Sequence, residues 1–209
     1  MSEKLYLKVP FNEKEEVKAI GGKWDWEKKQ WFVADTTDKK LIEKWLIVDK
    51  STRRAREGKQ LTIELVPSTC WFSNVRNHVS KDDWGVVKKH TFSKAGYRCE
   101  ICGGVGPDHP VECHEIWNYD DSNHIQTLEG TIALCPDCHR VKHIGLAQIH
   151  GVGQEAENWL AQINGWDRSF TSNYVDEAFE VWSERSIYDW SLNIDWLNST
   201  FGFKVVAER

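Results

Sequence analysis

LCPDCHRVKH, residues 134–143, decides the fold of this 209-residue chain, together with YRCEICGG at residues 97–104. These stretches supply two CxxC pairs, 32 residues apart, whose cysteines are Cys99, Cys102, Cys135 and Cys138. Four thiolates suit Zn2+, which takes four soft ligands in a tetrahedron and has no redox chemistry to damage the sulfurs. The glycines after Cys102 allow a tight turn that points backbone amides at the sulfurs. We therefore expect a closed structural zinc site, because a redox dithiol would explain one pair but not two.

Two histidines follow the second CxxC pair. Pro136 and Asp137 fit the first turn of a helix, where a missing amide hydrogen is harmless and a carboxylate is favourable. On such a helix, His139 and His143 lie four positions apart and share one face. The spacing therefore indicates a second metal site beside the zinc, and this second metal could do chemistry.

The composition is that of an ordinary soluble globular protein, with 40% hydrophobic and 28% charged residues. There is no run of about 18 apolar residues, and the N-terminus lacks the apolar stretch of a secretory signal. We therefore expect a cytoplasmic protein without a membrane partner. Six cysteines in a reducing compartment favour metal ligands and free thiols over disulfides. Cys70 and Cys113, which lie outside the CxxC pairs, are expected to be buried thiols.

Charge is distributed unevenly along the chain. The net charge of −5 argues weakly against a nucleic-acid partner. Residues 1–60 carry 15 basic and 11 acidic side chains, residues 61–150 carry 8 and 11, and residues 151–209 carry 4 and 10. The densest basic stretch holds Lys50, Arg53, Arg54, Arg56 and Lys59. Two interpretations of this stretch stay open, phosphate contacts with a nucleic acid or a solvated linker.

The front of the chain has the pattern of a small module. LYLKVPF, residues 5–11, alternates like a strand, and Asn12 followed by Glu15 resembles a capping box for a short helix. We expect a hairpin over residues 24–33. Thr37 is then expected to cap a final helix.

The sequence motifs LKVPF, GGKWD and KKQWFV, within roughly residues 4–46, resemble those of a known domain. They are similar to a small domain of unknown function that is found on DNA-processing proteins such as conjugative primases and topoisomerases. The resemblance names no chemistry. The tryptophans of this part could stack on bases, as in single-strand binders, but we favour the interpretation that they form the core of a very small domain.

We call residues 97–104 the first knuckle and residues 134–143 the second knuckle, after their CxxC pairs. The segment before the first knuckle combines a strand pattern with a helix signal. LTIELV, residues 61–66, alternates and predicts a leading strand. Ser80, with Asp83 three positions later, predicts the start of a helix. Asn74 and Arg76 could contact a backbone phosphate or form structural hydrogen bonds, and both interpretations stay open.

A third stretch, VECHEIW at residues 111–117, lies between the two knuckles. The three stretches together resemble the HNH endonucleases, also called ββα-metal or His-Me finger nucleases, over about residues 68–150. In that family the first strand of a hairpin carries a metal ligand and then a general base, and a helix supplies further ligands. The resemblance implies one catalytic divalent metal, Mg2+, Mn2+ or another ion, bound by His114, His139 and His143. It also implies Glu115 in the base position, DNA as partner, and a bacterial or phage source.

Two departures from the family pattern leave alternatives open. The first departure is Glu115, because the family commonly has a histidine in the base position. Glutamate is a weaker base than histidine near neutral pH unless burial raises its pKa. A one-residue shift would instead make His114 the base and Cys113 the adjacent residue, with Glu115 or Glu112 as possible ligands. The asparagine of the family name falls at Gly130, so that Thr131 or Asn123 would have to take its place.

Residues 151–209 predict a helical cap whose aromatic stripe packs on the nuclease core. Its acidity makes it a poor surface for DNA. A partner interface stays open, either in a homodimer or with an inhibitory protein.

The predicted fold class is α+β. We expect a small N-terminal α/β module (1–47), a linker and leading strand (48–66), a zinc-stapled ββα-metal, treble-clef-like nuclease domain (67–150) and a helical C-terminal cap (151–209). The predicted function is that of a metal-dependent endonuclease that hydrolyses DNA phosphodiester bonds through an HNH-type site. The alternatives are a noncatalytic, zinc-stabilised DNA-binding or adaptor protein, and a toxin-like effector restrained by a partner.

Overall fold

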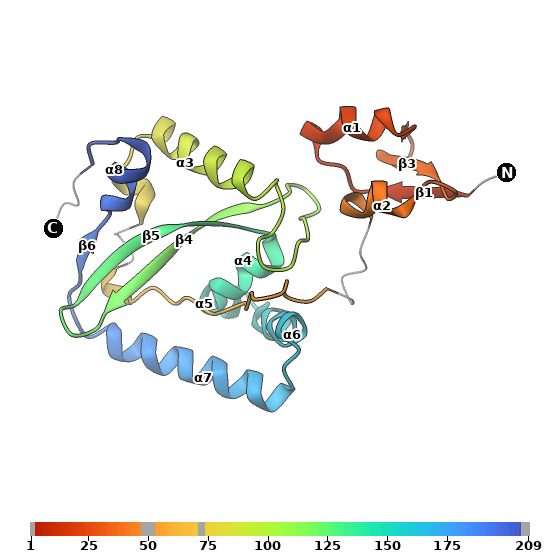
Figure 1. The fold of residues 1–209 in the computed structure, drawn as a ribbon. Coiled ribbons are helices and arrows are strands. Elements are labelled where there is room, and N and C mark those ends of the chain that lie inside the picture. The colour runs from red at the N-terminus through yellow and green to blue at the C-terminus, as the bar shows by residue number, and fades with distance from the viewer. Residues whose placement is uncertain (1–2, 47–52, 71–73, 206–209) are drawn as a thin grey trace. The chain divides into compact units, whose positions relative to one another are not determined.

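A computed structural model describes residues 3–46, 53–70 and 74–205 of the chain. The chain divides into two compact units, residues 1–52 and residues 53–209 (Figure 1). The fold is mixed α+β, as predicted, with one three-stranded sheet in each unit. Within the described residues, no helix is both long and apolar enough to cross a membrane.

The first unit is a three-stranded antiparallel sheet with two short helices. Its elements are β1 (Lys4–Leu7), η1 (Phe11–Glu13), α1 (Lys14–Ala19), β2 (Lys23–Asp25), β3 (Gln30–Ala34), α2 (Lys39–Ile42) and η2 (Glu43–Trp45). The strand order is β1-β3-β2, so that the predicted hairpin β2–β3 is confirmed. One sheet face and both helices bury a small core of Leu7, Val17, Val33, Ile42 and Trp45.

Both helix caps predicted for this unit are wrong. Asn12 lies inside the short helix η1, which begins directly after Pro10, and Glu13 precedes α1 without a capping side chain. The last helix begins at Lys39, where Asp38 Oδ1 accepts a hydrogen bond from the backbone amide of Lys40 at 3.0 Å. In each case a neighbouring residue occupies the cap position, a shift of one residue that sequence patterns alone do not resolve.

The tryptophans of the first unit do not share one role. Trp45 is a core residue, and Trp31 packs against the core. Trp26, in contrast, is 83% exposed, and its ring lies edge-on to that of Trp24 at 6.3 Å. The core interpretation therefore holds for Trp45 and Trp31 and is wrong for Trp26.

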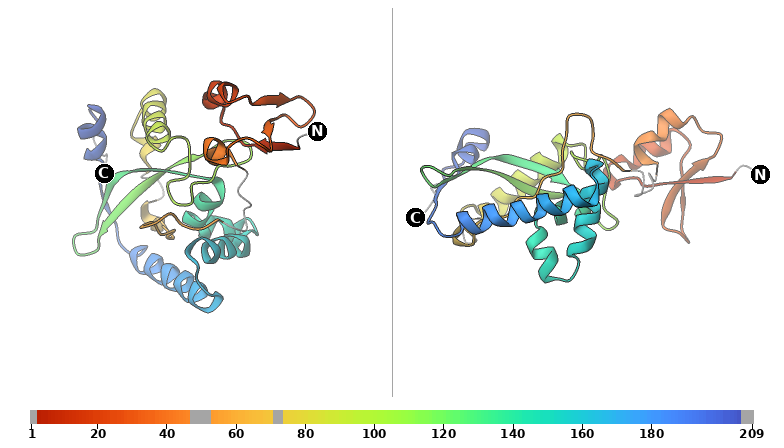
Figure 2. Two further views of the ribbon diagram at one scale, coloured as in Figure 1. Left: turned by 45° about the vertical axis from the view of Figure 1, so that its right-hand side comes forward. Right: turned by 90° about the horizontal axis from the view of Figure 1, so that it is seen from below.

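The second unit is built around a long hairpin. Its elements are η4 (Ser68–Cys70), η5 (Val75–Asn77), α3 (Lys81–Lys94), β4 (Glu112–Asp120), β5 (Ile125–Leu134), α4 (Pro136–Lys142), α5 (Ile144–Ile149), α6 (Gly153–Asn164), α7 (Arg168–Arg185), β6 (Ser191–Asn193) and α8 (Asp195–Phe201). Strands β4 and β5 pair in antiparallel fashion from Glu112 opposite Leu134 to Asp120 opposite Ile125. The views in Figures 1 and 2 show α3 and α7 on different sides of this hairpin.

The start of α3 and the end of the chain test two predictions. Ser80 caps α3 as predicted, because its hydroxyl accepts a hydrogen bond from the amide of Asp83 at 3.1 Å. The tail was expected to be helical, and α6, α7 and α8 are helices. Ser191–Asn193 departs from this expectation, since it forms strand β6 and pairs in parallel with β5.

The strand predicted for residues 61–66 is wrong. Residues 60–67, all of them described, are extended but lie outside the strands of both sheets. Their backbone bonds go elsewhere: the Leu61 amide donates to Asn164 Oδ1 at 2.9 Å, and the Glu64 amide donates to the Lys142 carbonyl at 3.1 Å. Trp182 Nε1 donates to the Val66 carbonyl at 3.0 Å. The segment thus crosses the unit as an extended strap, bound by helices α4, α6 and α7.

Candidate metal centres

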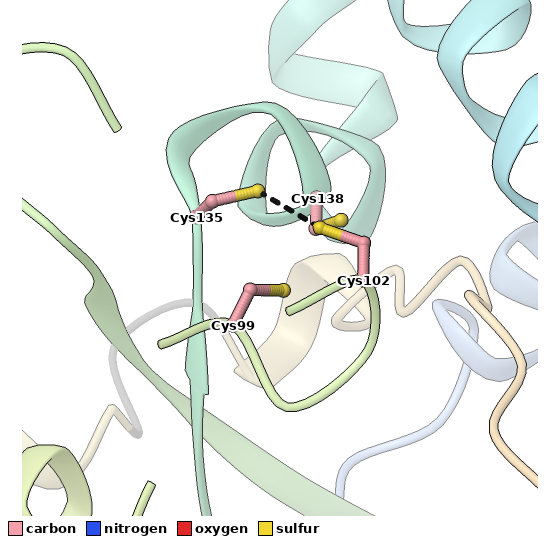
Figure 3. A group of neighbouring side chains, drawn as sticks. All are labelled: Cys99, Cys102, Cys135 and Cys138. Carbon is pink, nitrogen blue, oxygen red and sulfur yellow. Dashed lines mark hydrogen bonds between the residues drawn. The ribbon is translucent and has the colours of Figure 1, made fainter. Parts of the chain in front are cut away.

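The four cysteines of the two CxxC pairs converge in the second unit. Cys99 and Cys102 lie in the turn after α3, Cys135 precedes α4 and Cys138 lies in its first turn. Their sulfurs all lie within 4.8 Å of one another (Figure 3), with Cys102 Sγ 3.6 Å from Cys135 Sγ. Gly103, with φ of +70°, makes the tight turn that the sequence predicted after the first pair. The cluster could hold a metal ion such as zinc, as predicted.

The pKa values of these four thiols indicate how a cation would stabilise the cluster. Hydrogen bonds with Cys102, Cys135 and Cys138 hold the pKa of the Cys99 thiol far below its ordinary value. The pKa of Cys135 and that of Cys138 are raised, chiefly by Cys102. Side by side, four thiolates repel one another, so that they can all ionise together only around a positive charge. The four cysteines therefore fit a closed tetrathiolate zinc site.

The basic stretch before the strap is not simply a solvated linker. Arg53 is only 9% exposed, and its guanidinium packs so closely on Gly104, in the first knuckle, that a side chain at position 104 would force the guanidinium to move. Arg54 donates from Nη1 to the Arg53 carbonyl at 2.7 Å. Lys50 lies outside the described residues. A buried cation beside the knuckle partly balances the negative charge that a tetrathiolate site would carry.

A second cluster brings three imidazoles together. His114 comes from β4, His139 from α4, and His143 follows α4 directly as its C-cap residue. One nitrogen of each ring lies within 4.8 Å of the other two. The ring centroids are 5.3 Å apart for His114 and His139, 4.9 Å for His114 and His143, and 4.7 Å for His139 and His143. The three histidines singled out from the sequence thus lie side by side.

Two carboxylates orient two of these rings. Glu64 Oε2, from the strap, lies 2.9 Å from His114 Nε2, and Glu112 Oε2 lies 2.5 Å from His139 Nδ1. With a proton on each contacted nitrogen, the opposite nitrogen of each ring is a free acceptor. His114 Nδ1 is such an atom, buried and without a hydrogen-bond partner among the described residues. Metal-binding histidines show this arrangement, in which a carboxylate holds the nitrogen that does not bind the metal. The cluster therefore fits a divalent cation.

The charge states of the cluster also suit a cation. Burial, helped by the two neighbouring imidazoles, lowers the pKa of His143 to about 3, and burial lowers the pKa of His139. Both rings are therefore neutral near pH 7, which is the form that binds metals. Burial alone would raise the pKa of Glu64, but His114 and Lys142 outweigh it and hold this pKa below its ordinary value. Glu64 thus stays ionised beside His114.

Glu115 does not join the imidazoles. Neighbouring residues on a strand point to opposite faces, so that Glu115 faces away from His114. Its Oε1 is buried without a partner among the described residues. Burial, with a smaller contribution from the Glu115 charge, raises the pKa of the Cys113 thiol on the same face. Thr131 lies opposite Glu115 in the hairpin, whereas Asn123 lies in the turn at the far end and donates to Asp120. Of the two candidates for the asparagine position, only Thr131 is therefore next to Glu115.

Glu64 and Lys142 belong to the site but were not singled out from the sequence. Lys142 is 4% exposed, and its ammonium contacts Glu64 Oε1 and donates to Thr62 Oγ1 at 2.7 Å. The available signal was the lone carboxylate in the apolar run LTIELV, together with the lysine next to His143. Neither signal says which other part of the chain the residue meets.

Comparisons with known proteins match only parts of this chain. Residues 4–46 match a family described as a domain of unknown function (DUF5710), which agrees with the predicted resemblance. The chain is 40% identical over 62 residues to a DNA primase TraC of Escherichia coli, covering 30% of this chain and 5% of that protein. A second DNA primase TraC of Escherichia coli is 40% identical over 43 residues, or 21% of this chain and 3% of that protein. The chain thus spans a very small part of these relatives. No solved structure matches it.

Proposed function

We propose that the second unit is a metal-dependent endonuclease that hydrolyses DNA phosphodiester bonds at the imidazole cluster. The observation that carries the proposal is the convergence of His114, His139 and His143, two of them held by carboxylates on their far nitrogens. The tetrathiolate cluster would hold zinc and fix α4, on which both clusters depend. The similarity of part of this chain to part of DNA primase TraC favours a role in DNA processing.

The donor set explains what the cluster could do. A divalent cation held by three neutral imidazoles would keep its full charge beside a phosphate and would make a water a better nucleophile near neutral pH. Arg76 adds positive charge on the same side, since its charge is among the causes that lower the pKa of His139. An arginine there is suited to holding a phosphate of the substrate.

The contacts of His114 bear on the choice of base. His114 has one nitrogen at Glu64, and the other would bind the cation, which leaves no nitrogen to accept a proton. We therefore retain His114 as a ligand. Glu115 lies on the opposite face of β4, so that its role as proton acceptor rests on the resemblance alone and is tested by Glu115→Gln.

Cleavage of supercoiled plasmid by the full chain tests the proposal. We expect nicking in Mg2+, Mn2+, Ni2+ or Zn2+ that EDTA abolishes. His114→Ala should abolish it while the zinc content per chain stays unchanged, and His150→Ala, an exposed histidine just beyond α5, should cut normally. Intact plasmid with all four metals, combined with retained DNA binding, would refute the endonuclease and favour the noncatalytic DNA-binding alternative.

A further inference from the structure

The sheet of the first unit has a second face that its core does not use. Leu7 and Val33 point into the core, so that their neighbours on the strands point the other way. Tyr6 and Phe32, directly opposite each other on β1 and β3, therefore lie on the second face. Lys23 pairs with Phe32 and lies there too. Both helices of the unit contribute to the core on the first face, through Val17 of α1 and Ile42 of α2.

Two aromatic rings and three lysines make up this second face. The Tyr6 and Phe32 rings lie 5.9 Å apart, and both side chains are only half-buried. Lys4 Nζ lies 4.5 Å from the centroid of the Phe32 ring, and Lys28 Nζ lies 4.2 Å from that of Tyr6. Each ring thus has an ammonium group over its face, and each ring is partly exposed to solvent.

The charge of the face is positive. Asp25 is its acidic residue, and its carboxylate accepts hydrogen bonds from Tyr6 Oη at 2.8 Å and Lys4 Nζ at 3.1 Å. The amide of Lys28 also donates to it, which holds the pKa of Asp25 below its ordinary value. Asp25 is therefore used to fix Tyr6 and Lys4 in place. With Lys23 and Lys28 included, three cations stand against this one anion.

We propose that this face binds single-stranded DNA, with bases stacked on Tyr6 and Phe32 and phosphates on Lys4, Lys23 and Lys28. An exposed cation–π contact is weaker than the stacking of a base on the same ring, so that a base can displace the ammonium. The displaced lysine then stays within reach of a phosphate on the same strand. Paired bases are stacked within a duplex and cannot reach the rings, so that the face suits a single strand.

The choice of DNA over RNA rests on the proposed function of the second unit, whereas the binding face itself does not. The experiment is therefore carried out in Ca2+ with no added Mg2+, Mn2+, Ni2+ or Zn2+, so that the tetrathiolate cluster keeps its metal. Binding of the full chain to a fluorescent oligo-dT of 15 nucleotides is followed by anisotropy. Unlabelled oligo-U and a duplex of equal length serve as competitors. We expect oligo-dT to compete better than either of them.

Two variants separate stacking from charge. Phe32→Leu keeps apolar volume but removes the π-face, and we expect about tenfold weaker binding. Lys23→Glu/Lys28→Glu should weaken binding at least as much and lower the slope of log K against log salt by about 1.4. Lys39→Glu/Lys40→Glu on α2 makes the same charge change on exposed positions outside the face and should bind within threefold of wild type.

Crosslinking locates the bound strand. An oligo-dT containing 5-iodouracil is irradiated with the full chain, and crosslinked peptides are mapped by mass spectrometry. Crosslinks to Tyr6 or Phe32 are the expected result. The proposal is overturned if all crosslinks fall within residues 53–209, if the control pair weakens binding as much as the Lys23/Lys28 pair, or if oligo-U or the duplex competes better. None of these results would bear on plasmid cleavage, which depends on the second unit.

Discussion

Glu64 and His114 are fifty positions apart in the sequence, yet Glu64 Oε2 lies 2.9 Å from His114 Nε2. The contact joins the extended strap to the first strand of the hairpin. It fixes which nitrogen of His114 carries the proton and leaves Nδ1 free to face His139 and His143. A residue outside the three recognised stretches thus decides how the central imidazole is presented.

Glu64→Gln should weaken binding of Mn2+ to the second cluster by about 10- to 100-fold, because the variant no longer orients and polarises His114. The same change leaves the ammonium of Lys142, 4% exposed, without its anion and should cost about 3 kcal/mol of unfolding free energy. Isothermal titration with Mn2+ and urea denaturation measure the two effects.

A double variant separates these effects. Glu64→Gln/Lys142→Met removes the orphaned charge and should recover most of the stability but none of the Mn2+ affinity. Glu180→Gln, at an exposed position on α7, is the matched control and should change neither quantity. Wild-type Mn2+ affinity in the double variant would mean that Glu64 does not orient His114.

Cys138→Ser should reduce bound zinc from about one ion per chain to none, measured by elemental analysis after gel filtration. The variant should also lose structure in the second unit, since α4 then has no fixed start. Cys113→Ser is the control, because burial raises the pKa of Cys113 to about 11 and keeps it a thiol outside the cluster. Equal zinc content in both variants would contradict a site made of Cys99, Cys102, Cys135 and Cys138.

The stability of the protein without a metal at the imidazoles should fall as pH drops from about 6.5 toward 3. His143 has a pKa of about 3 in the folded protein, so that in this window the unfolded chain takes up a proton that the folded chain does not. The sign follows: unfolding binds protons, and acid favours unfolding. The loss is on the order of 5 kcal/mol for this one group.

Urea denaturation of wild type and His143→Asn at pH 7 and pH 5 checks this sign. Acid also threatens the thiolate cluster, but that effect is common to both proteins, and their difference isolates His143. The variant should lose less stability between the two pH values than wild type does. An equal loss would mean that His143 is not held neutral by burial.

Arg76→Gln should weaken binding of a DNA duplex in Ca2+ several-fold and lower the salt slope by about 0.9, the value for one lost phosphate contact. The reason is that the Arg76 charge acts at His139, within the proposed site. Arg168→Gln, exposed at the start of α7, should leave both quantities unchanged. If both arginine variants behave alike, Arg76 contributes only general charge.

Glu115→Gln decides which carboxylate accepts the proton. If Glu115 is the base, nicking should slow by about 100-fold or more, and Mn2+ affinity should stay within twofold of wild type. Because Glu115 Oε1 is buried without a partner among the described residues, the amide should fold at least as stably. Full nicking by this variant would move the proton acceptor to the imidazole face, where Glu112 lies.

The parts of both clusters that sequence predicted are those that local spacing encodes. A CxxC pair in a tight turn, and histidines four apart around a helix, are geometric consequences of short-range backbone structure. His114 was found only through a resemblance, because nothing in its own neighbourhood points to α4. Glu64 was out of reach, since its partner lies fifty positions away and the alternation of LTIELV indicated a strand.

The errors in the predicted fold have a similar origin. The strap has the alternation of a strand, but its amides and carbonyls bond to residues of α4, α6 and α7 and not to a neighbouring strand. Strand β6 is three residues long, too short for a period of two to stand out against the aromatic pattern around it. Local patterns describe what a segment can form, and the rest of the chain selects among those forms.

The contacts of the strap and of the residues just after it can form only late in synthesis at the ribosome. Leu61 meets Asn164 at a separation of 103 positions, and Thr69 meets Tyr188 at a separation of 119. The nascent polypeptide must therefore carry this apolar stretch unprotected until more than a hundred further residues have emerged. The β1–β3 sheet and its core, built from residues 3–46, can form long before then. Slow translation of the α6–α7 region would thus lengthen the period in which chaperones and proteases compete for the incomplete chain.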